Sequence, residues 1–298
     1  MRVTPPLPER IKRQSGQHAL VDGIAFEMPV DSHETPALMA AFTLDADKAD
    51  ALMPGDELHA LRLKGGRGLL LLTVVNYSNT DIGSYVEFSI AILCTRGAKP
   101  APALPSLLMR KHFGFGQYVH DLPVSTQVSV RGGLGIWGMP KRQASLDFKL
   151  VGRNGSSQYD LDGQTVLRLD VDGPRTRRIP VRFSGIAYSA FRGILWKSAV
   201  YFGGHAGVRV KPGAARLHLG DHPRAQALKE LDINPRSLFA AVVASADGVL
   251  DDHFEGWFLT YAEAQTQTPE GLEQLDGIGL GREWLPPPVR AASAEVTS

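Results

Sequence analysis

The chain of 298 residues is predicted to form a sheet-rich α+β domain that is closed or folded back on itself. Several segments alternate apolar and polar residues with a period of two, which is typical of strands with one buried face. Asx-Gly dipeptides, the commonest signal of tight hairpin turns, stand between such segments. Few stretches show helical spacing. A hydrophobic fraction of 43% excludes a disordered chain and can supply a large core.

The clearest alternation lies in residues 145–150 and 167–172. Between them, Asn154-Gly155 and Asp162-Gly163 can supply the positive φ angles that hairpin turns require. This region is therefore predicted to be an antiparallel meander with one dry and one wet face.

Residues 68–75 and 85–94 are almost continuously apolar, which favours strands covered on both faces. The polar connection 76–83 between them is rich in turn-forming residues. Cys94, the single cysteine, lies in the second of these runs, so no disulfide can form within the chain. We expect a buried, inert thiol that acts as a small hydrophobic group.

Two helices are predicted, over 45–53 with Asp45 as the cap, and over 223–231 after Asp221. No internal repeat and no linker precede residue 284. We therefore expect a single domain over residues 1–284, followed by a disordered Pro/Ala/Ser tail over 285–298.

The charge balance argues against a nucleic-acid partner, because 32 basic and 31 acidic residues leave a formal net charge of +1. The N-terminus lacks the apolar stretch of a signal peptide, and the longest apolar run is too short to cross a bilayer. The sequence predicts a soluble cytoplasmic protein that binds neither nucleic acid nor membrane.

Two apparent motifs do not meet their structural requirements. Residues 133–138 match the Gly-x-Gly-x-x-Gly dinucleotide fingerprint, but Pro140 follows at once where a helix should open. His218 and His222 have a spacing that could suit metal ligands, yet a glycine and a proline interrupt that segment. A turn followed by a helix cap explains the two histidines better, and no metal site is predicted.

Residues 135–142 carry the strongest chemical signal. Trp137 and Met139 offer apolar cover beside Lys141, and two glycines allow a close approach of the backbone. A free lysine amine has a pKa of about 10.4, so a nucleophilic lysine needs a shift of roughly three units, or about 4 kcal/mol. Apolar walls and the neighbouring cation Arg142 would both lower the pKa of Lys141. The alternative is an ordinary solvated lysine in a turn.

These residues resemble the acetoacetate decarboxylase superfamily, whose catalytic lysine follows a Gly and a Pro and precedes a second basic residue. The resemblance rests on residues 137–142 (Trp-Gly-Met-Pro-Lys-Arg), 83–87 (Gly-Ser-Tyr-Val-Glu) and 120–123 (His-Asp-Leu-Pro), with a weaker match at 219–223. It spans about residues 35–260. It implies a closed antiparallel β-barrel or cone with a few peripheral helices.

The resemblance also implies that Lys141 forms a Schiff base with a keto acid, with no metal or organic cofactor, because the iminium is itself the electron sink. Arg142 would take the place of the family's second lysine and depress the pKa of Lys141, an activation that is the established account of this enzyme family. Glu87 would orient the substrate or move protons. Tyr85 would then be a packing or hydrogen-bonding partner. With Trp137 and Met139, it is expected to contact the substrate in a homo-oligomeric enzyme.

The sequence departs from the decarboxylases at two positions. Their acidic residue on the strand before Glu87 falls near Leu72, and their N-terminal pocket arginine falls near Thr35. The substrate carboxylate then has four unranked candidate partners: Arg62, Arg67, Arg96 and Arg110.

Three functions stay open. The first is a β-keto acid decarboxylase. The second is an aldolase-dehydratase that acts on pyruvate-like α-keto acids through the same lysine. The third is a non-catalytic module that binds a small ligand on the same scaffold.

Overall fold

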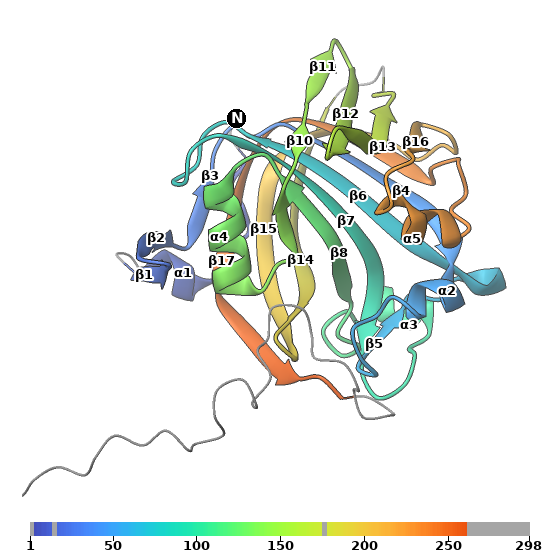
Figure 1. Ribbon diagram of the computed structural model, residues 1–298, viewed down its shortest axis with the longest axis horizontal. Coiled ribbons are helices and arrows are strands. Elements are labelled where there is room, and N and C mark those ends of the chain that lie inside the picture. Colours follow the sequence, from blue (N-terminus) through green and yellow to red (C-terminus); the bar gives the residue numbers. More distant parts are fainter. Residues whose placement is uncertain (1–2, 14–16, 175–177, 261–298) are drawn as a thin grey trace, which may run out of the picture. The chain divides into compact units, whose positions relative to one another are not determined.

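The computed structural model describes residues 3–13, 17–174 and 178–260. The predicted tail over 285–298 and the end of the predicted domain over 1–284 lie outside these residues. Two sheets and a separate hairpin account for most of the described chain (Figure 1).

The largest sheet forms a closed barrel. Its ten strands within the described ranges are β3 (Val30–Ser32), β4 (Ala37–Asp45), β5 (Leu58–Ala60), β6 (Arg67–Tyr77), β7 (Tyr85–Arg96), β8 (Gly116–Val124), β9 (Lys141–Gln143), β14 (Ile179–Phe191), β15 (Ile194–Arg209) and β17 (Phe239–Phe258). Seven of them close a ring in the order β7-β6-β4-β17-β15-β14-β8, and β8 then pairs with β7.

The prediction of an antiparallel barrel is wrong in one respect, because the ring is mixed. Strands β14 and β8 run parallel, whereas the other pairs of the ring are antiparallel. A closed ring with an odd number of strands cannot alternate in direction all the way round, so one parallel pair is unavoidable. Strand β9 adds a second parallel pairing to β8 outside the ring, with Lys141 opposite Leu122.

The predicted meander forms a second, five-stranded antiparallel sheet. It consists of β10 (Ser145–Leu146), β11 (Lys149–Val151), β12 (Asn154–Leu161), β13 (Gln164–Val171) and β16 (Ala215–Leu219). The turn at Asp162-Gly163 is confirmed, with φ values of 50° and 76°. The turn expected at Asn154-Gly155 is wrong, because residues 152 and 153 make it and Asn154 already begins β12. Gly155 instead lies against Leu38, where a Cβ atom would come within 2.2 Å of a methyl group.

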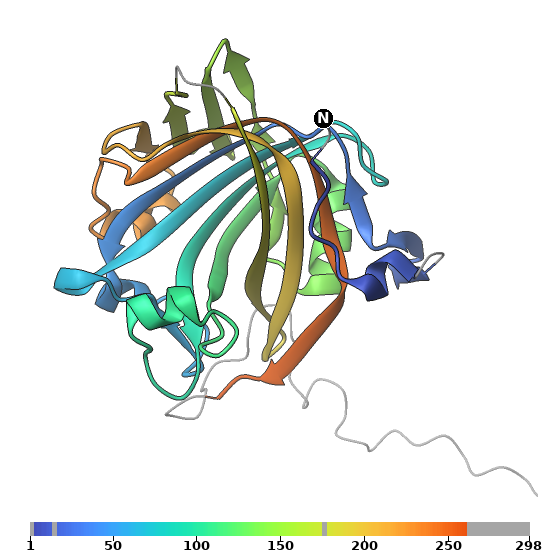
Figure 2. The same cartoon turned by 180° about the vertical axis from the view of Figure 1, so that it is seen from behind.

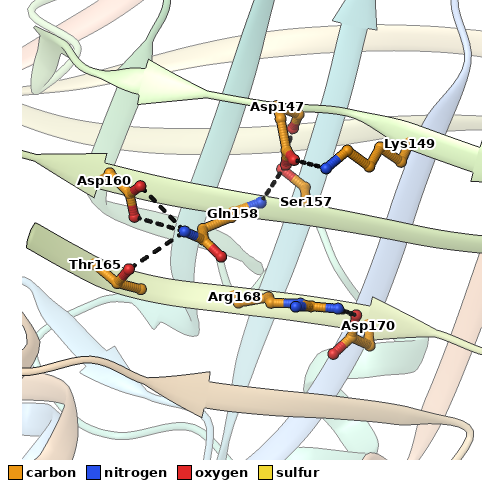
Figure 3. Close-up of polar contacts among 8 residues, drawn as sticks. All are labelled: Asp147, Lys149, Ser157, Gln158, Asp160, Thr165, Arg168 and Asp170. Atoms are coloured by element: carbon orange, nitrogen blue, oxygen red, sulfur yellow. Dashed lines mark hydrogen bonds and ion pairs between the residues drawn. The ribbon is translucent and has the colours of Figure 1, made fainter.

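The outward face of this second sheet is polar, as predicted (Figure 3). The Gln158 side chain donates to Asp160 and Thr165, and Arg168 pairs with Asp170 along one strand. Asp147 accepts from the Gln158 backbone N–H at 2.7 Å.

The opposite face of the small sheet packs against the barrel and makes the main core. Strand β6 shows how the two sides divide, since its alternate residues point in opposite directions. Leu70, Leu72 and Val74 are fully buried in the core with Tyr159 and Leu167 of the small sheet. Their neighbours along β6 face the interior of the barrel. The prediction that residues 68–75 and 85–94 form strands is confirmed, but one face of each lines a cavity and is not covered by packed side chains.

Short helices and one hairpin complete the fold (Figure 2). The helices are α1 (Glu9–Arg13), α2 (Ala46–Asp50), α3 (Ala103–Leu108), α4 (Gln127–Trp137) and α5 (Ala225–Glu230), with a 3₁₀ turn η1 at Lys64–Gly66; the hairpin pairs β1 (Gln17–Val21) with β2 (Ile24–Met28). The cap at Asp45 is confirmed, because its carboxylate accepts from two backbone N–H groups of α2. None of the helices in the described part of the chain is long and apolar enough to span a membrane.

Helix α4 was not predicted, and it changes the meaning of the glycine-rich segment. Residues 133–137 close this helix instead of opening one, which removes the geometry that a dinucleotide-binding turn needs. Gly138 follows the helix and leads through Met139 and Pro140 into β9.

Candidate active site

The barrel encloses a cavity of about 330 Å³. Side chains from seven strands of the ring line it, together with residues from β3, β9, α4 and adjacent loops. Most of the lining is apolar. Among the lining residues that the structure describes, three carry charged side chains: Glu87, Arg110 and Lys141.

Lys141 reaches this cavity from the first position of β9, with a side chain that is 8% exposed. Its methylene chain passes over Gly133 of α4. A Cβ atom at Gly133 would lie 2.3 Å from the Cδ atom of Lys141, far inside van der Waals contact. A glycine at this position therefore leaves the room through which the amine reaches the lumen.

Three polar groups surround the Lys141 amine. Its Nζ atom lies 2.8 Å from Oε2 of Glu87 and donates to Oγ of Ser129 at 2.9 Å. It also lies 5.4 Å from the centre of the Tyr85 ring, within range of a cation–π contact. Tyr85 and Glu87 share a face of β7, as the alternation of that strand predicted.

The electrostatics of this cluster differ from the prediction. Burial acts to lower the pKa of Lys141, but the Glu87 carboxylate and the Tyr85 hydroxyl outweigh it, so the pKa lies above its ordinary value. Burial is also the main cause that raises the pKa of Tyr85 to about 12. The resting amine is therefore an ammonium ion held in a buried ion pair.

The structure does not place Arg142 beside the Lys141 amine, where its predicted role would need it. Its Nε atom pairs with Oδ1 of Asp121 at 2.9 Å, and it does not line the cavity. It is not among the causes that set the pKa of Lys141. Successive residues of a strand point to opposite faces, so the neighbour of a lumen-facing lysine on β9 points away from the lumen.

The three residues predicted to contact the substrate, Tyr85, Trp137 and Met139, all line the cavity. Trp137 is 3% exposed, and its indole N–H donates to the backbone carbonyl of Asp251 at 3.1 Å. This hydrogen bond joins the end of α4 to β17. Helix α4, which lies against the Lys141 side chain at Gly133, is thereby attached to a strand of the barrel.

The structure also places the two residues at which the sequence departs from the decarboxylase pattern. Thr35 lines the cavity, with 2% of its surface exposed. Leu72 does not, because it faces the core between the sheets; its neighbours Leu71 and Thr73 face the lumen instead. No carboxylate stands at either of these lumen positions, so Glu87 is the single acid among the described lining residues.

The four arginines that were candidates for binding the substrate carboxylate differ in whether they line the cavity. Arg62 pairs with Asp47 and Asp50, and Arg67 pairs with Asp232, all away from the lumen. Arg96 stacks over the Trp257 ring at 3.9 Å. Arg110 alone among the four lines the cavity.

Cys94 and His222 take structural positions, and His218, which was expected in a turn, lies instead in β16 beside Asp170. Cys94 is fully buried, and burial raises the pKa of its thiol well above the ordinary value. Nδ1 of His222 accepts from the Arg224 backbone N–H at 3.1 Å, ahead of α5. In the described part of the chain, no three His, Cys, Asp or Glu side chains gather into a group that could hold a metal ion.

Two polar residues of the cluster were missed from the sequence. Ser129 lies on the unpredicted helix α4, so no strand pattern could have placed it near Lys141. Tyr77 is directly opposite Tyr85 in the pairing of β6 and β7, and its pKa is raised by burial and by the nearby Glu87 carboxylate. The hairpin geometry of those two strands could have indicated Tyr77, because cross-strand partners share a face.

The sequence model of the acetoacetate decarboxylase family matches residues 13–181 of this chain, more than half of its length. The chain belongs to this family. Both Glu87 and Lys141 lie in the matched range. No curated protein sequence matches the chain significantly.

Several solved structures share the fold at low sequence identity. Acetoacetate decarboxylase from Legionella pneumophila is 15% identical, with a TM-score of 0.53 over 79% of this chain and 89% of that one. The enduracididine biosynthesis enzyme MppR is 16% identical, with a TM-score of 0.52 over 79% and 89%. An acetoacetate decarboxylase-like enzyme from Sphingomonas wittichii is 13% identical, with a TM-score of 0.51 over 83% and 100%. These likenesses establish the barrel fold.

Proposed function

We propose that the protein is a lyase that forms a Schiff base with a keto acid through Lys141, and that its simplest reaction is decarboxylation of a β-keto acid. The observation that carries the proposal is the Lys141 amine itself. It lies in a largely apolar cavity, and the Glu87 carboxylate is close enough to exchange a proton with it directly.

The first half of the proposed reaction makes the iminium. Lys141 begins as an ammonium ion and passes a proton to Glu87 across the 2.8 Å contact. The freed lone pair attacks the ketone carbon, and one of the two protons then on the nitrogen moves to the carbonyl oxygen to give a neutral carbinolamine, while Glu87 keeps the first proton. Glu87 then returns its proton to the departing hydroxyl, so water leaves and a protonated imine remains on Lys141.

The second half breaks the carbon–carbon bond. The electron pair of the bond to the carboxylate moves into the iminium, which releases carbon dioxide and leaves an enamine. Protonation of the enamine carbon and hydrolysis of the imine release the ketone and restore the amine. The largely apolar lining of the cavity would favour loss of the charged carboxylate.

A second candidate is the aldolase-dehydratase reaction on pyruvate-like acids through the same lysine. Two observations favour it. Leu71 and Thr73 face the lumen on the strand before Glu87, so no second acid supports decarboxylation there. In addition, MppR has been solved with the condensation product of pyruvate and imidazole 4-carboxaldehyde, at a TM-score of 0.50 to this chain.

Borohydride reduction in the presence of acetoacetate or pyruvate, followed by peptide mass mapping, tests the proposal. We expect a ligand-sized mass on the peptide that contains Lys141, and its absence in Lys141→Ala. Carbon dioxide release from acetoacetate would support the decarboxylase. An adduct with pyruvate and no gas from acetoacetate would support the aldolase-dehydratase. If neither acid gives an adduct and ligand binding is unchanged in Lys141→Ala, the enzymatic proposal is wrong and a binding module remains.

A further inference from the structure

The cavity extends far beyond the reactive amine. Lys141 pairs with Leu122 near one end of β8, whereas Arg110 precedes the other end, where the Phe115 backbone N–H donates to its carbonyl. Gly116 and Leu122 are six residues apart, so these levels are separated by roughly 20 Å along the strand at about 3.3 Å per residue. Both Lys141 and Arg110 line the same cavity.

The stretch between the two cations is largely apolar, with Gln117 of β8 as a polar residue among its lining. Val119 lies between them on β8, and Leu93 is opposite Gln117 on the neighbouring strand. Phe115 and Ile186 line the Arg110 end, since the backbone of Ile186 lies against Gly116. A ligand as small as acetoacetate would leave this part of the lumen without a contact, although apolar walls contribute most of the binding energy of such pockets.

Arg110 has no carboxylate partner among the described residues. Its guanidinium lies 5.3 Å from the Phe115 ring centre, and Nη2 is 3.4 Å from the backbone carbonyl of Ser184. Glu87, the single acid among the described lining residues, is already paired with Lys141 at the other end. Arg110 is therefore an exposed arginine at the end of the cavity, and the guanidinium N–H groups that do not donate to Ser184 can bind an anion.

We propose that the substrate is an elongated keto acid whose apolar chain fills the lumen and whose distal end carries a second carboxylate bound by Arg110. The inference rests on the proposed function, since it assumes that the keto group reacts at Lys141. At this separation, Arg110 cannot contact a carboxylate next to the reacting carbonyl. It acts instead on the far end of the molecule, where it would select both chain length and terminal charge.

Three acids test this assignment: acetoacetate, β-oxopentadecanoate and β-oxopentadecanedioate, whose twelve bonds between the keto carbon and the distal carboxylate span about 15 Å and, with the contacts at both ends, about 20 Å. The readout is the concentration of each that gives half-maximal borohydride trapping on Lys141, a step common to both proposed chemistries. We expect the long diacid to be trapped at a concentration at least tenfold lower than acetoacetate. Arg110→Gln should reduce the preference for the diacid over the long monoacid about tenfold, a loss typical of a charge-assisted hydrogen bond.

Two further variants control the comparison. Arg236→Gln removes an exposed arginine that does not line the cavity. The half-maximal trapping concentrations of the three acids should therefore keep the same order and the same ratios as in the wild type. Ile186→Phe narrows the Arg110 end and should move the preference from the long acids back toward acetoacetate; Arg110→Gln carries the test if this variant does not fold.

The outcomes distinguish failure of the elongated-substrate proposal from failure of the Schiff-base function. Equal half-saturation for all three acids, or an unchanged diacid preference in Arg110→Gln, would overturn the assignment of an elongated substrate while acetoacetate trapping upheld the Schiff base. If none of the acids is trapped on Lys141, the proposed function itself fails.

Discussion

Lys141 and Arg142 are neighbours on a three-residue strand, yet they belong to two different electrostatic environments. Lys141 faces the lumen, where its amine meets Glu87 and Ser129 beside space for a ligand. Arg142 faces the other way and meets Asp121, which is also approached by Arg224 and by the hydroxyl of Tyr159. In the lumen, the pair of Glu87 and Lys141 lies beside the cavity that can hold a ligand. The outer cluster, made of Asp121 and its three partners, does not line that cavity, and through Tyr159 it joins the barrel to the small sheet.

This contrast explains why two adjacent basic residues need not share a function. The pleat separates them, so proximity in sequence does not place the Arg142 charge next to the Lys141 amine. The lysine is then controlled mainly by its lumen partner and by burial. The following predictions test that division, beginning with the largest expected effect.

Replacing the nucleophile should remove activity altogether, whereas replacing its neighbour should not. Lys141→Arg retains a cation beside Glu87 but offers no nucleophilic amine at neutral pH, so turnover should fall to the uncatalysed background. Arg142→Gln should still give the reduced adduct on Lys141, with the same dependence of trapping on pH. A shift of that pH dependence in Arg142→Gln would contradict the division between the two faces.

Glu87→Gln should lower turnover about 10²- to 10⁴-fold, because the proposed acid and base is lost. Although turnover falls, the pH at which Lys141 becomes reactive should also fall in this variant. Glu87 raises the pKa of Lys141 and burial lowers it, so removing the carboxylate leaves burial dominant and the pKa falls. Borohydride trapping needs the neutral amine and should therefore begin at a lower pH in Glu87→Gln than in the wild type. Trapping that begins at a higher pH would show that Glu87 does not hold the proton on Lys141.

Gly133→Ala tests the path of the lysine side chain. The added Cβ would clash with the Lys141 methylenes and move the amine away from Glu87 and Ser129. A displacement of about 1 Å in an active site can cost roughly 10²-fold in rate, and we expect a loss of that order in trapping rate. Circular dichroism and urea unfolding serve as the control for folding. Wild-type trapping in a folded Gly133→Ala protein would mean that the lysine has another route into the lumen.

Asp121→Asn should disturb stability more than chemistry. It leaves Arg142 and Arg224 without their shared carboxylate, and each of these side chains is 34% exposed. We expect urea unfolding to show a loss of about 2–3 kcal/mol, below the 3–5 kcal/mol typical of a fully buried pair, because water reaches both guanidinium groups. The matched control is Asp162→Asn, whose side chain is 83% exposed and whose cost should stay within about 0.5 kcal/mol. Equal losses in the two variants would contradict a structural role for the outer cluster.

Local regularities of the chain were sufficient for much of this picture. Alternation placed Tyr85 and Glu87 on one face of a strand, the cap at Asp45 marked the start of a helix, and Asp162-Gly163 marked a turn. Each of these features depends on residues within a few positions of one another, where backbone geometry has few options. The segment around Lys141 was singled out for the same reason.

Tertiary structure alone decided which faces became the lumen and which groups met there. Glu87 and Lys141 are far apart in sequence and come together only because β9 joins β8, which itself pairs with β7. The parallel pair that closes the ring, the position of Ser129 on α4 and the separation of Arg110 from Lys141 likewise depend on long-range pairing. Coulombic and hydrogen-bonding effects act through space, so the ionisation of Lys141 followed from its partner across the lumen and not from its neighbour in the chain.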